Sequence, residues 1–102
     1  MTALPPFPSG STPEALRPLL GEVVIVDTDT HYVFLGKLEH GDREFLCLSQ
    51  VDIHEIRPSG LNKERYAHEA RKIGVRANRD LTYIPMARVV ALSRLCDVKD
   101  FQ

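Results

Sequence analysis

The stretch EVVIVDTDTHYVFLGKLEHGDREFLCLSQVDIHEI, from Glu22 to Ile56, decides the fold because it alternates apolar runs with short polar connections. The runs are residues 22–28, 31–41 and 43–56, and the connections between them are DTDT and HGD. β-Branched and aromatic residues favour strands, and connections this short join antiparallel neighbours. The stretch therefore predicts a three-stranded antiparallel meander.

Two features of these strands carry further information. Gly36 lies inside the second strand, where a glycine marks a bend or the close approach of another backbone. In the third strand Asp52 and His54 alternate with Val51 and Ile53, so the two polar side chains share one exposed face. We expect Asp52 and His54 either to support a subunit interface or to pair with a basic helix.

On the N-terminal side of the meander, the sequence predicts a tail and a short helix. Residues 1–11 are rich in Pro, Ser and Gly and show no periodicity, which predicts a disordered tail. Pro13 suits the first position of a helix, and Pro18 limits that helix to about two turns. The length of the chain is that of one domain, which we expect to span residues 12–102.

On the C-terminal side, the sequence predicts a second helix and two further strands. The segment LNKERYAHEARKIG places Tyr66, Ala70 and Ile73 on one apolar stripe of a helix. This helix forms an insertion at about residues 59–75. The next segment, LTYIPMARVVALSRL, has strand composition, but Pro85 cannot donate to a sheet ladder, so two strands are expected to meet there.

Charge is distributed unevenly along the chain. Residues 1–56 carry a formal charge of −6 and residues 57–79 carry +5, although the whole chain carries only −1. The basic candidates on and after the second helix are Lys63, Arg65, Arg71, Lys72, Arg76 and Arg79. Such a segment could hold phosphate backbones through salt-dependent contacts. The alternative, a solvated helix whose cations pair with the acidic half of the chain, is favoured by the pI of 6.4.

The acidic, histidine and cysteine residues are the candidates for a metal or catalytic site. Asp27, Asp29 and His31 alternate in DTDTH, but Asp and Thr are favoured in hairpins because they bond the turn backbone. No CxxC, HExxH, EF-hand, GxSxG or glycine-rich phosphate motif is present. We therefore expect a protein that is not an enzyme and holds no metal or cofactor. Cys47 and Cys96 lie in apolar runs and are expected to be buried thiols.

The order of these elements resembles that of the Sm and Sm-like (LSm) family. LLGEVVIVDTDTHYVFLGKLEHGDREFLCL resembles the first Sm motif, with Gly36, Leu38 and Asp42 at matching positions, and YIPMARVVAL can be aligned with the second. The sequence also looks similar to uncharacterised bacterial Sm-like proteins. The resemblance implies a mainly β fold, in which a short N-terminal helix precedes a strongly bent five-stranded antiparallel sheet. This sheet is a small open barrel, with the helical insertion between its third and fourth strands.

The same resemblance implies a homo-oligomeric ring of roughly five to seven subunits, in which the fourth strand of each subunit pairs with the fifth strand of its neighbour. In the family, uridine-rich single-stranded RNA binds inside the pore. By position, the pore candidates are Asp42, Arg43, Phe45 and Arg88. Leu46 stands where the family has the asparagine that reads the base, and the letters PMA replace its arginine, glycine and asparagine. The uridine pocket is therefore largely absent.

Together these features predict a cytoplasmic Sm-like ring with a role in RNA binding or RNA metabolism. The RNA would contact the pore candidates or the basic helix. The alternative is a protein-interaction or scaffolding ring that does not bind RNA and uses the basic helical insertion as its partner surface. No apolar run approaches the roughly 20 residues that span a bilayer, so no membrane partner is expected.

Overall fold

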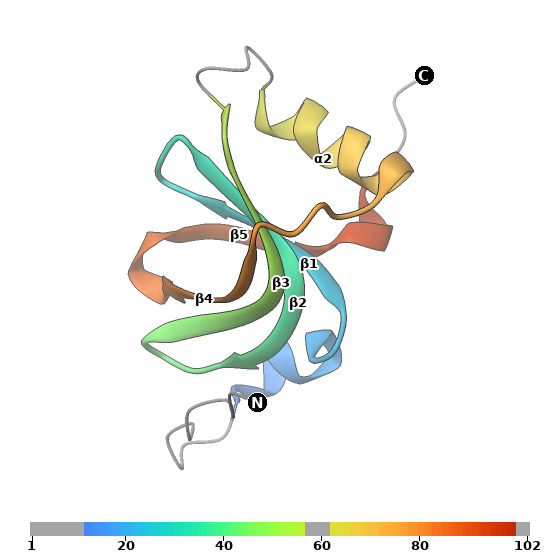
Figure 1. Ribbon diagram of the computed structural model, residues 1–102. Coiled ribbons are helices and arrows are strands. Elements are labelled where there is room, and N and C mark those ends of the chain that lie inside the picture. The colour runs from blue at the N-terminus through green and yellow to red at the C-terminus, as the bar shows by residue number, and fades with distance from the viewer. Residues whose placement is uncertain (1–11, 57–61, 100–102) are drawn as a thin grey trace.

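The computed structural model describes residues 12–56 and 62–99 of the chain (Figure 1). The tail predicted at residues 1–11 and the predicted start of the insertion at residues 59–61 lie outside this description. The elements are the 3-10 helix η1 (Glu14–Leu19), strands β1 (Val23–Thr28), β2 (Tyr32–Gly41) and β3 (Phe45–Glu55), helix α2 (Lys63–Ile73), strand β4 (Arg79–Pro85), the 3-10 turn η2 (Met86–Arg88), strand β5 (Val89–Arg94) and the 3-10 turn η3 (Leu95–Asp97).

The strands form one antiparallel sheet in the order β4-β3-β2-β1-β5. The predicted meander is confirmed as β1, β2 and β3, and β5 returns along the free side of β1, where Val26 lies opposite Leu92. The predicted break at Pro85 is also confirmed, because β4 ends at this residue and η2 leads into β5. Within the described residues the sheet does not close, since β4 and β5 lie at its two edges. The mainly β class and the helix between the third and fourth strands are thus as predicted.

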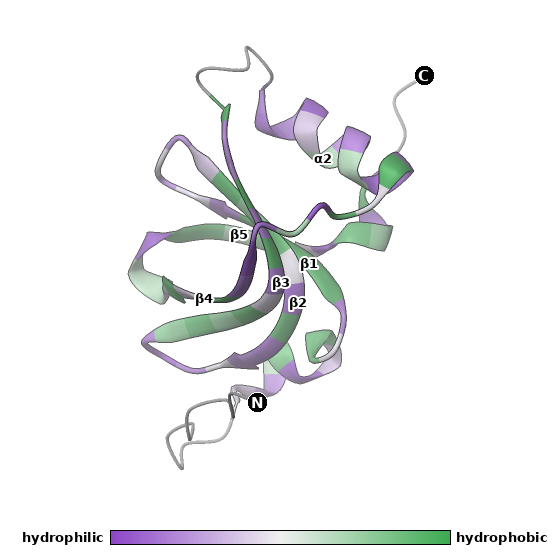
Figure 2. Cartoon of the chain, in the orientation of Figure 1, coloured by the Kyte–Doolittle hydropathy of each residue, from purple (hydrophilic) through white to green (hydrophobic). Residues whose placement is uncertain are grey.

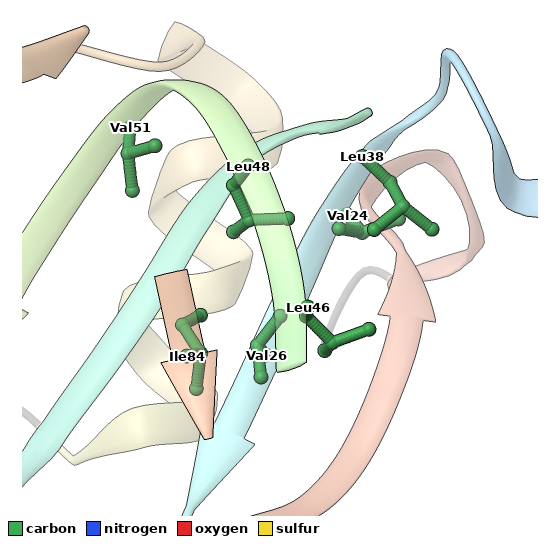
Figure 3. Close-up of a cluster of buried hydrophobic side chains, with 7 residues drawn as sticks. All are labelled: Val24, Val26, Leu38, Leu46, Leu48, Val51 and Ile84. Atoms are coloured by element: carbon green, nitrogen blue, oxygen red, sulfur yellow. The ribbon is translucent and has the colours of Figure 1, made fainter. Parts of the chain in front are cut away.

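The main core lies on the inner face of the bent sheet (Figure 3). Its fully buried members come from β1, β2, β3 and β4 and are Val24, Val26, Leu38, Leu46, Leu48, Val51 and Ile84. Leu16 and Leu19 of η1 and Leu92 of β5 pack against this cluster. Full burial of one such aliphatic side chain contributes about 1.5–3 kcal/mol, so this face is the main source of stability.

A second apolar cluster lies on the outer face, where α2 covers the sheet. Val33 and Leu35 of β2 pack against Tyr66 and Ala70 of α2. Figure 2 shows that the remainder of α2 is largely hydrophilic. The predicted apolar stripe is wrong at Ile73, which is 63% exposed. The buried residues of the helix are Tyr66, Ala67 and Ala70, so the contact with the sheet ends before the last turn.

The sheet bends sharply where β2 passes β3 at Gly36. Leu35 lies opposite Asp52 but Lys37 lies opposite Ser49, so β3 carries one extra residue here, which is a β-bulge. Gln50 in this bulge has a φ of 49°. A Cβ atom at Gly36 would lie 2.9 Å from the carbonyl oxygen of Ser49 and 3.2 Å from a methyl group of Val51. The predicted close backbone approach at Gly36 is therefore confirmed.

We expect Gly36→Ala to lower the free energy of unfolding by about 1–3 kcal/mol, because the added methyl group meets the backbone of β3 rather than a side chain that can move away. Urea unfolding followed by circular dichroism measures this loss. Gly21→Asn is the control, since no atom lies within 4 Å of a Cβ at Gly21 and asparagine tolerates its positive φ of 81°. Equal losses in the two variants would contradict the steric explanation.

Candidate nucleic-acid interface

The β2–β3 loop is held by the predicted pore residue Asp42. Oδ1 of Asp42 accepts hydrogen bonds from the backbone N–H groups of Glu44, at 2.7 Å, and Phe45, at 2.8 Å. The backbone N–H of Asp42 donates to the carbonyl oxygen of Phe45 at 3.0 Å. The two N–H donors, that of Phe45 first, lower the pKa of the Asp42 carboxyl below its ordinary value. Asp42 therefore shapes the loop, and one of its two oxygens is occupied by the loop backbone.

The loop presents Arg43 and Phe45 to solvent. Arg43 is exposed, and the Phe45 side chain is 42% exposed at the start of β3. The Phe45 ring meets the ring of Tyr83, on β4, edge to face, with centroids 6.4 Å apart. Tyr83 is itself 43% exposed. Two aromatic rings therefore lie together on the surface beside the loop, of which Phe45 was predicted from the sequence and Tyr83 was not.

The turn η2 lies beside the β2–β3 loop, but the side chain of its residue Arg88 contacts the β1–β2 hairpin instead of this loop. The backbone N–H of Met86 donates to the carbonyl oxygen of Glu44 at 2.7 Å, which joins the turn to the loop. The guanidinium of Arg88 instead lies 3.2 Å from the carboxylate of Asp29 in the β1–β2 hairpin. The structure thus brings the predicted loop residues and η2 together, and it pairs the Arg88 side chain with a neighbouring hairpin.

The position that would read a uridine edge lies inside the protein. Leu46 is fully buried and belongs to the inner core. A leucine side chain has no hydrogen-bonding group, and its burial also keeps it away from a ligand in solvent. The leucine at position 46, where the Sm-like family has an asparagine, is therefore required by the packing of this core.

The predicted basic residues of the helix divide into anchors and exposed cations. Nζ of Lys63 lies 2.6 Å from Oδ1 of Asp27 and 2.7 Å from the carbonyl oxygen of Thr28, which ties the start of α2 to β1. The guanidinium of Arg71 donates to the carbonyl oxygen of Val98. The remaining cations, Arg65, Lys72, Arg76 and Arg79, are exposed. The expected pairing with the acidic half of the chain is found at Lys63.

Asp52 and His54 of β3 also contact the helix, and they do so through Tyr66. The hydroxyl of Tyr66 donates to Oδ2 of Asp52, and Nδ2 of Asn78 lies 3.2 Å from Oδ1 of the same carboxylate. The imidazole of His54 stacks on the Tyr66 ring, with centroids 4.5 Å apart and planes 13° from parallel. Burial first, and then the bond to Asp52, raise the pKa of Tyr66 far above its ordinary value. Alternation in β3 predicted the shared face of Asp52 and His54, whereas no sequence signal identified Asn78.

The acidic residues of the DTDTH segment do not converge on one point. Asp27 forms an ion pair with Lys63, and Asp29 forms one with Arg88. The hydroxyls of Thr28 and Thr30 bond the backbone of Tyr32 at the hairpin, as expected for such turn residues. Across the described parts of the chain, no group of three or more His, Cys, Asp or Glu side chains could hold a metal ion.

The two cysteines lie in different environments. Cys47 is 1% exposed, and burial raises the pKa of its thiol. Cys96 is exposed in η3, so the prediction that both are buried is wrong for this residue. The apolar run that contains Cys96 continues past the end of β5 into a surface turn, where alternation no longer places a side chain inside.

No protein-family model and no curated protein matches this sequence. A membrane-crossing helix would need a length and an apolar character that no helix in residues 12–56 and 62–99 has.

The contacts of Asp42 predict a specific pH dependence. Because the folded state lowers the pKa of Asp42, its contribution to stability is present above the pKa of the unfolded chain, near 3.9, and is lost as pH falls through the lower folded value. Asp42→Asn keeps an acceptor for the loop but does not titrate there. The stability advantage of the wild type over this variant should shrink as pH falls from about 6 to about 3.

Urea midpoints across this pH range measure that advantage. Asp80→Asn removes the same charge at an exposed position at the start of β4 and is the matched control. If Asp80→Asn loses stability relative to wild type with the same pH profile as Asp42→Asn, the loop hydrogen bonds are not the cause.

Proposed function

We propose that this protein is a homo-oligomeric Sm-like ring that binds single-stranded RNA. The observation that carries the proposal is the strand order, which places β4 and β5 at the two edges of one bent sheet. Among the strands that the structure describes, β4 pairs only with β3 and β5 pairs only with β1. The resemblance of the sequence to Sm-like proteins implies that these two edges join neighbouring subunits.

The composition of the edges supports such joining. An unpaired strand edge offers a row of backbone donors and acceptors to another chain, and head-to-tail contacts between two different edges form a ring when the rotation between neighbouring subunits closes. Val90 on β5 is 66% exposed and Tyr83 on β4 is 43% exposed. The single charged residue of β5, Arg94, is bonded to Asp97 at 2.9 Å. Little on the β5 edge therefore opposes a second strand.

The loop beside the edges supports the RNA-binding part of the proposal. Arg43 and Phe45 are exposed next to η2, and in a ring they would be repeated once per subunit. Stacking on an aromatic side chain contributes about 1–3 kcal/mol per base and tolerates any base. An exposed ring with a neighbouring arginine suits single-stranded RNA without requiring a uridine pocket.

A second candidate function is a scaffolding ring that does not bind RNA. Two observations favour it: Leu46 is fully buried where a base reader would be needed, and the guanidinium of Arg88 is paired with Asp29. In that case the exposed cations of α2 would form the surface for a protein partner. The two candidates share the ring and differ in their affinity for RNA.

The ring predicts a solution mass several times the 11.5 kDa of one chain, measured by light scattering at micromolar concentration. Val90→Lys should reduce this mass, because a charge on the exposed β5 edge opposes strand pairing. Ile73→Lys is the matched control, since Ile73 is 63% exposed but belongs to α2 and to neither edge strand. A wild-type monomer would contradict the ring.

The RNA-binding candidate predicts an affinity that depends strongly on salt. A fluorescent single-stranded RNA should lose about tenfold or more in affinity between 50 and 200 mM salt, as expected when several phosphates are neutralised. Phe45→Ala should weaken this binding, and Tyr32→Ala, a comparably exposed aromatic on β2, should not. A ring without salt-dependent RNA affinity would favour the scaffolding candidate.

A further inference from the structure

A groove of about 480 Å³ lies between α2 and β3. It is lined by His54 of β3, by Arg65, Tyr66, Glu69 and Ile73 of α2, and by Arg76 after the helix. We call this surface the α2–β3 groove. Its volume falls within the range of about 300–1,000 Å³ that is typical of small-molecule sites. In Figure 1, α2 and the β2–β3 loop lie at opposite ends of the molecule, so this groove is separate from the predicted pore.

The groove contains a fixed aromatic platform. His54 stacks on the ring of Tyr66 at a centroid distance of 4.5 Å, and Tyr66 is only 8% exposed. The Tyr66 hydroxyl bonds Asp52, whose other oxygen accepts from Asn78. The imidazole that lines the groove is therefore backed by a buried ring with its own hydrogen bond. Such a rigid planar surface suits a flat aromatic ligand.

Cationic and apolar groups surround this platform. Arg65 lies on the first turn of α2 and Arg76 lies beyond its end, so two exposed guanidinium groups reach the groove from separate parts of the chain. Arginine binds phosphate through paired hydrogen bonds. Ile73, which is 63% exposed, adds an apolar wall. The groove thus offers a stacking surface, an apolar contact and two phosphate-binding side chains.

Two acidic side chains also line the groove and limit which ligand fits. Asp52 has both oxygens engaged by Tyr66 and Asn78, which reduces its repulsion of an anion. Glu69 is exposed on α2 between the positions of Arg65 and Ile73. A phosphate near Glu69 would be disfavoured, so a ligand with a single phosphate beside its ring suits the groove better than a dense polyanion.

The geometry points to the α2–β3 groove as a nucleotide site, in which a base stacks on His54 and its phosphate is bound by Arg65 and Arg76. The ligand is either a free mononucleotide or one nucleotide of a single-stranded RNA. In its RNA form the inference rests on the proposed RNA-binding function and places a second contact on the helical insertion. An acidic peptide could satisfy the arginines but would not use the aromatic platform, which is why a nucleotide is favoured.

Calorimetric titration with AMP, adenosine and a single-stranded RNA of about eight nucleotides tests the site. AMP should bind and adenosine should bind at least about tenfold more weakly, because it lacks the group that the arginines recognise. Arg65→Gln with Arg76→Gln should weaken AMP binding about tenfold or more. Lys72→Gln with Arg79→Gln removes the same charge at two exposed positions outside the groove and should leave AMP binding within about twofold.

The platform is tested at His54. His54→Ala should weaken AMP binding about fivefold or more, whereas His54→Phe, which retains a stacking plane, should largely preserve it. Circular dichroism of both variants establishes that the fold is intact. Glu69→Gln should strengthen binding, because it removes a negative charge beside the phosphate. Absence of AMP and RNA binding, or equal effects of the groove and control pairs, would overturn the site.

Further comparisons distinguish a free nucleotide from a nucleotide of RNA. They also distinguish failure of this inference from failure of the proposed function. RNA binding much tighter than AMP binding, with the same sensitivity to His54→Ala, identifies a nucleotide of RNA; AMP binding that equals or exceeds RNA binding identifies a free nucleotide. If AMP does not bind, RNA binding that is lost in Phe45→Ala but not in the groove variants would overturn this inference while upholding the pore. Polyglutamate binding that is unaffected by His54→Ala, without AMP binding, would show an acidic-peptide surface and overturn the nucleotide site.

Discussion

The close passage of β2 over β3 at Gly36 is the constraint on which the arrangement of the sheet depends. There is no room for a Cβ between this residue and the carbonyl of Ser49, and the bulge at Gln50 turns β3 at the same point. The bend lets one sheet enclose the inner core from several sides. On the outer face of the sheet only a small apolar patch, which includes Val33 and Leu35, remains to be covered, and the single helix α2 covers it.

Helix α2 is fixed to the sheet by three kinds of contact. Lys63 bonds Asp27 at its start, Tyr66 and Ala70 pack on β2, and the Tyr66 hydroxyl bonds Asp52 of β3. The charged contact at Lys63 is partly exposed and contributes little on its own. The buried ring and its bond to Asp52 therefore set the position of the helix. As a result, Arg65, Arg76 and the His54 ring line a groove of defined shape.

The sequence was sufficient to predict the elements because their signals are local. Apolar runs, short polar connections and Pro85 predicted five strands that the structure contains, and Gly36 predicted the close approach. The candidate sites depended on packing between distant segments, which periodicity does not describe. The exposure of Ile73, the pairing of Arg88 with Asp29 and the stacking of His54 on Tyr66 each require the relative placement of two elements.

The position of Asn78 has a consequence for folding and for aggregation. β3 continues past the point where β4 begins, and the Asn78 side chain bonds both the N–H and the C=O of Ile53 at 3.2 and 3.1 Å. A side-chain amide thus takes the place of a neighbouring strand. It blocks a stretch of open β3 edge that another chain could otherwise extend, and it penalises any slippage of β4 along β3, because a shifted register would leave Ile53 without this partner. Among the described strands, one asparagine therefore covers this part of β3, while β4 and β5 remain the open edges of the sheet.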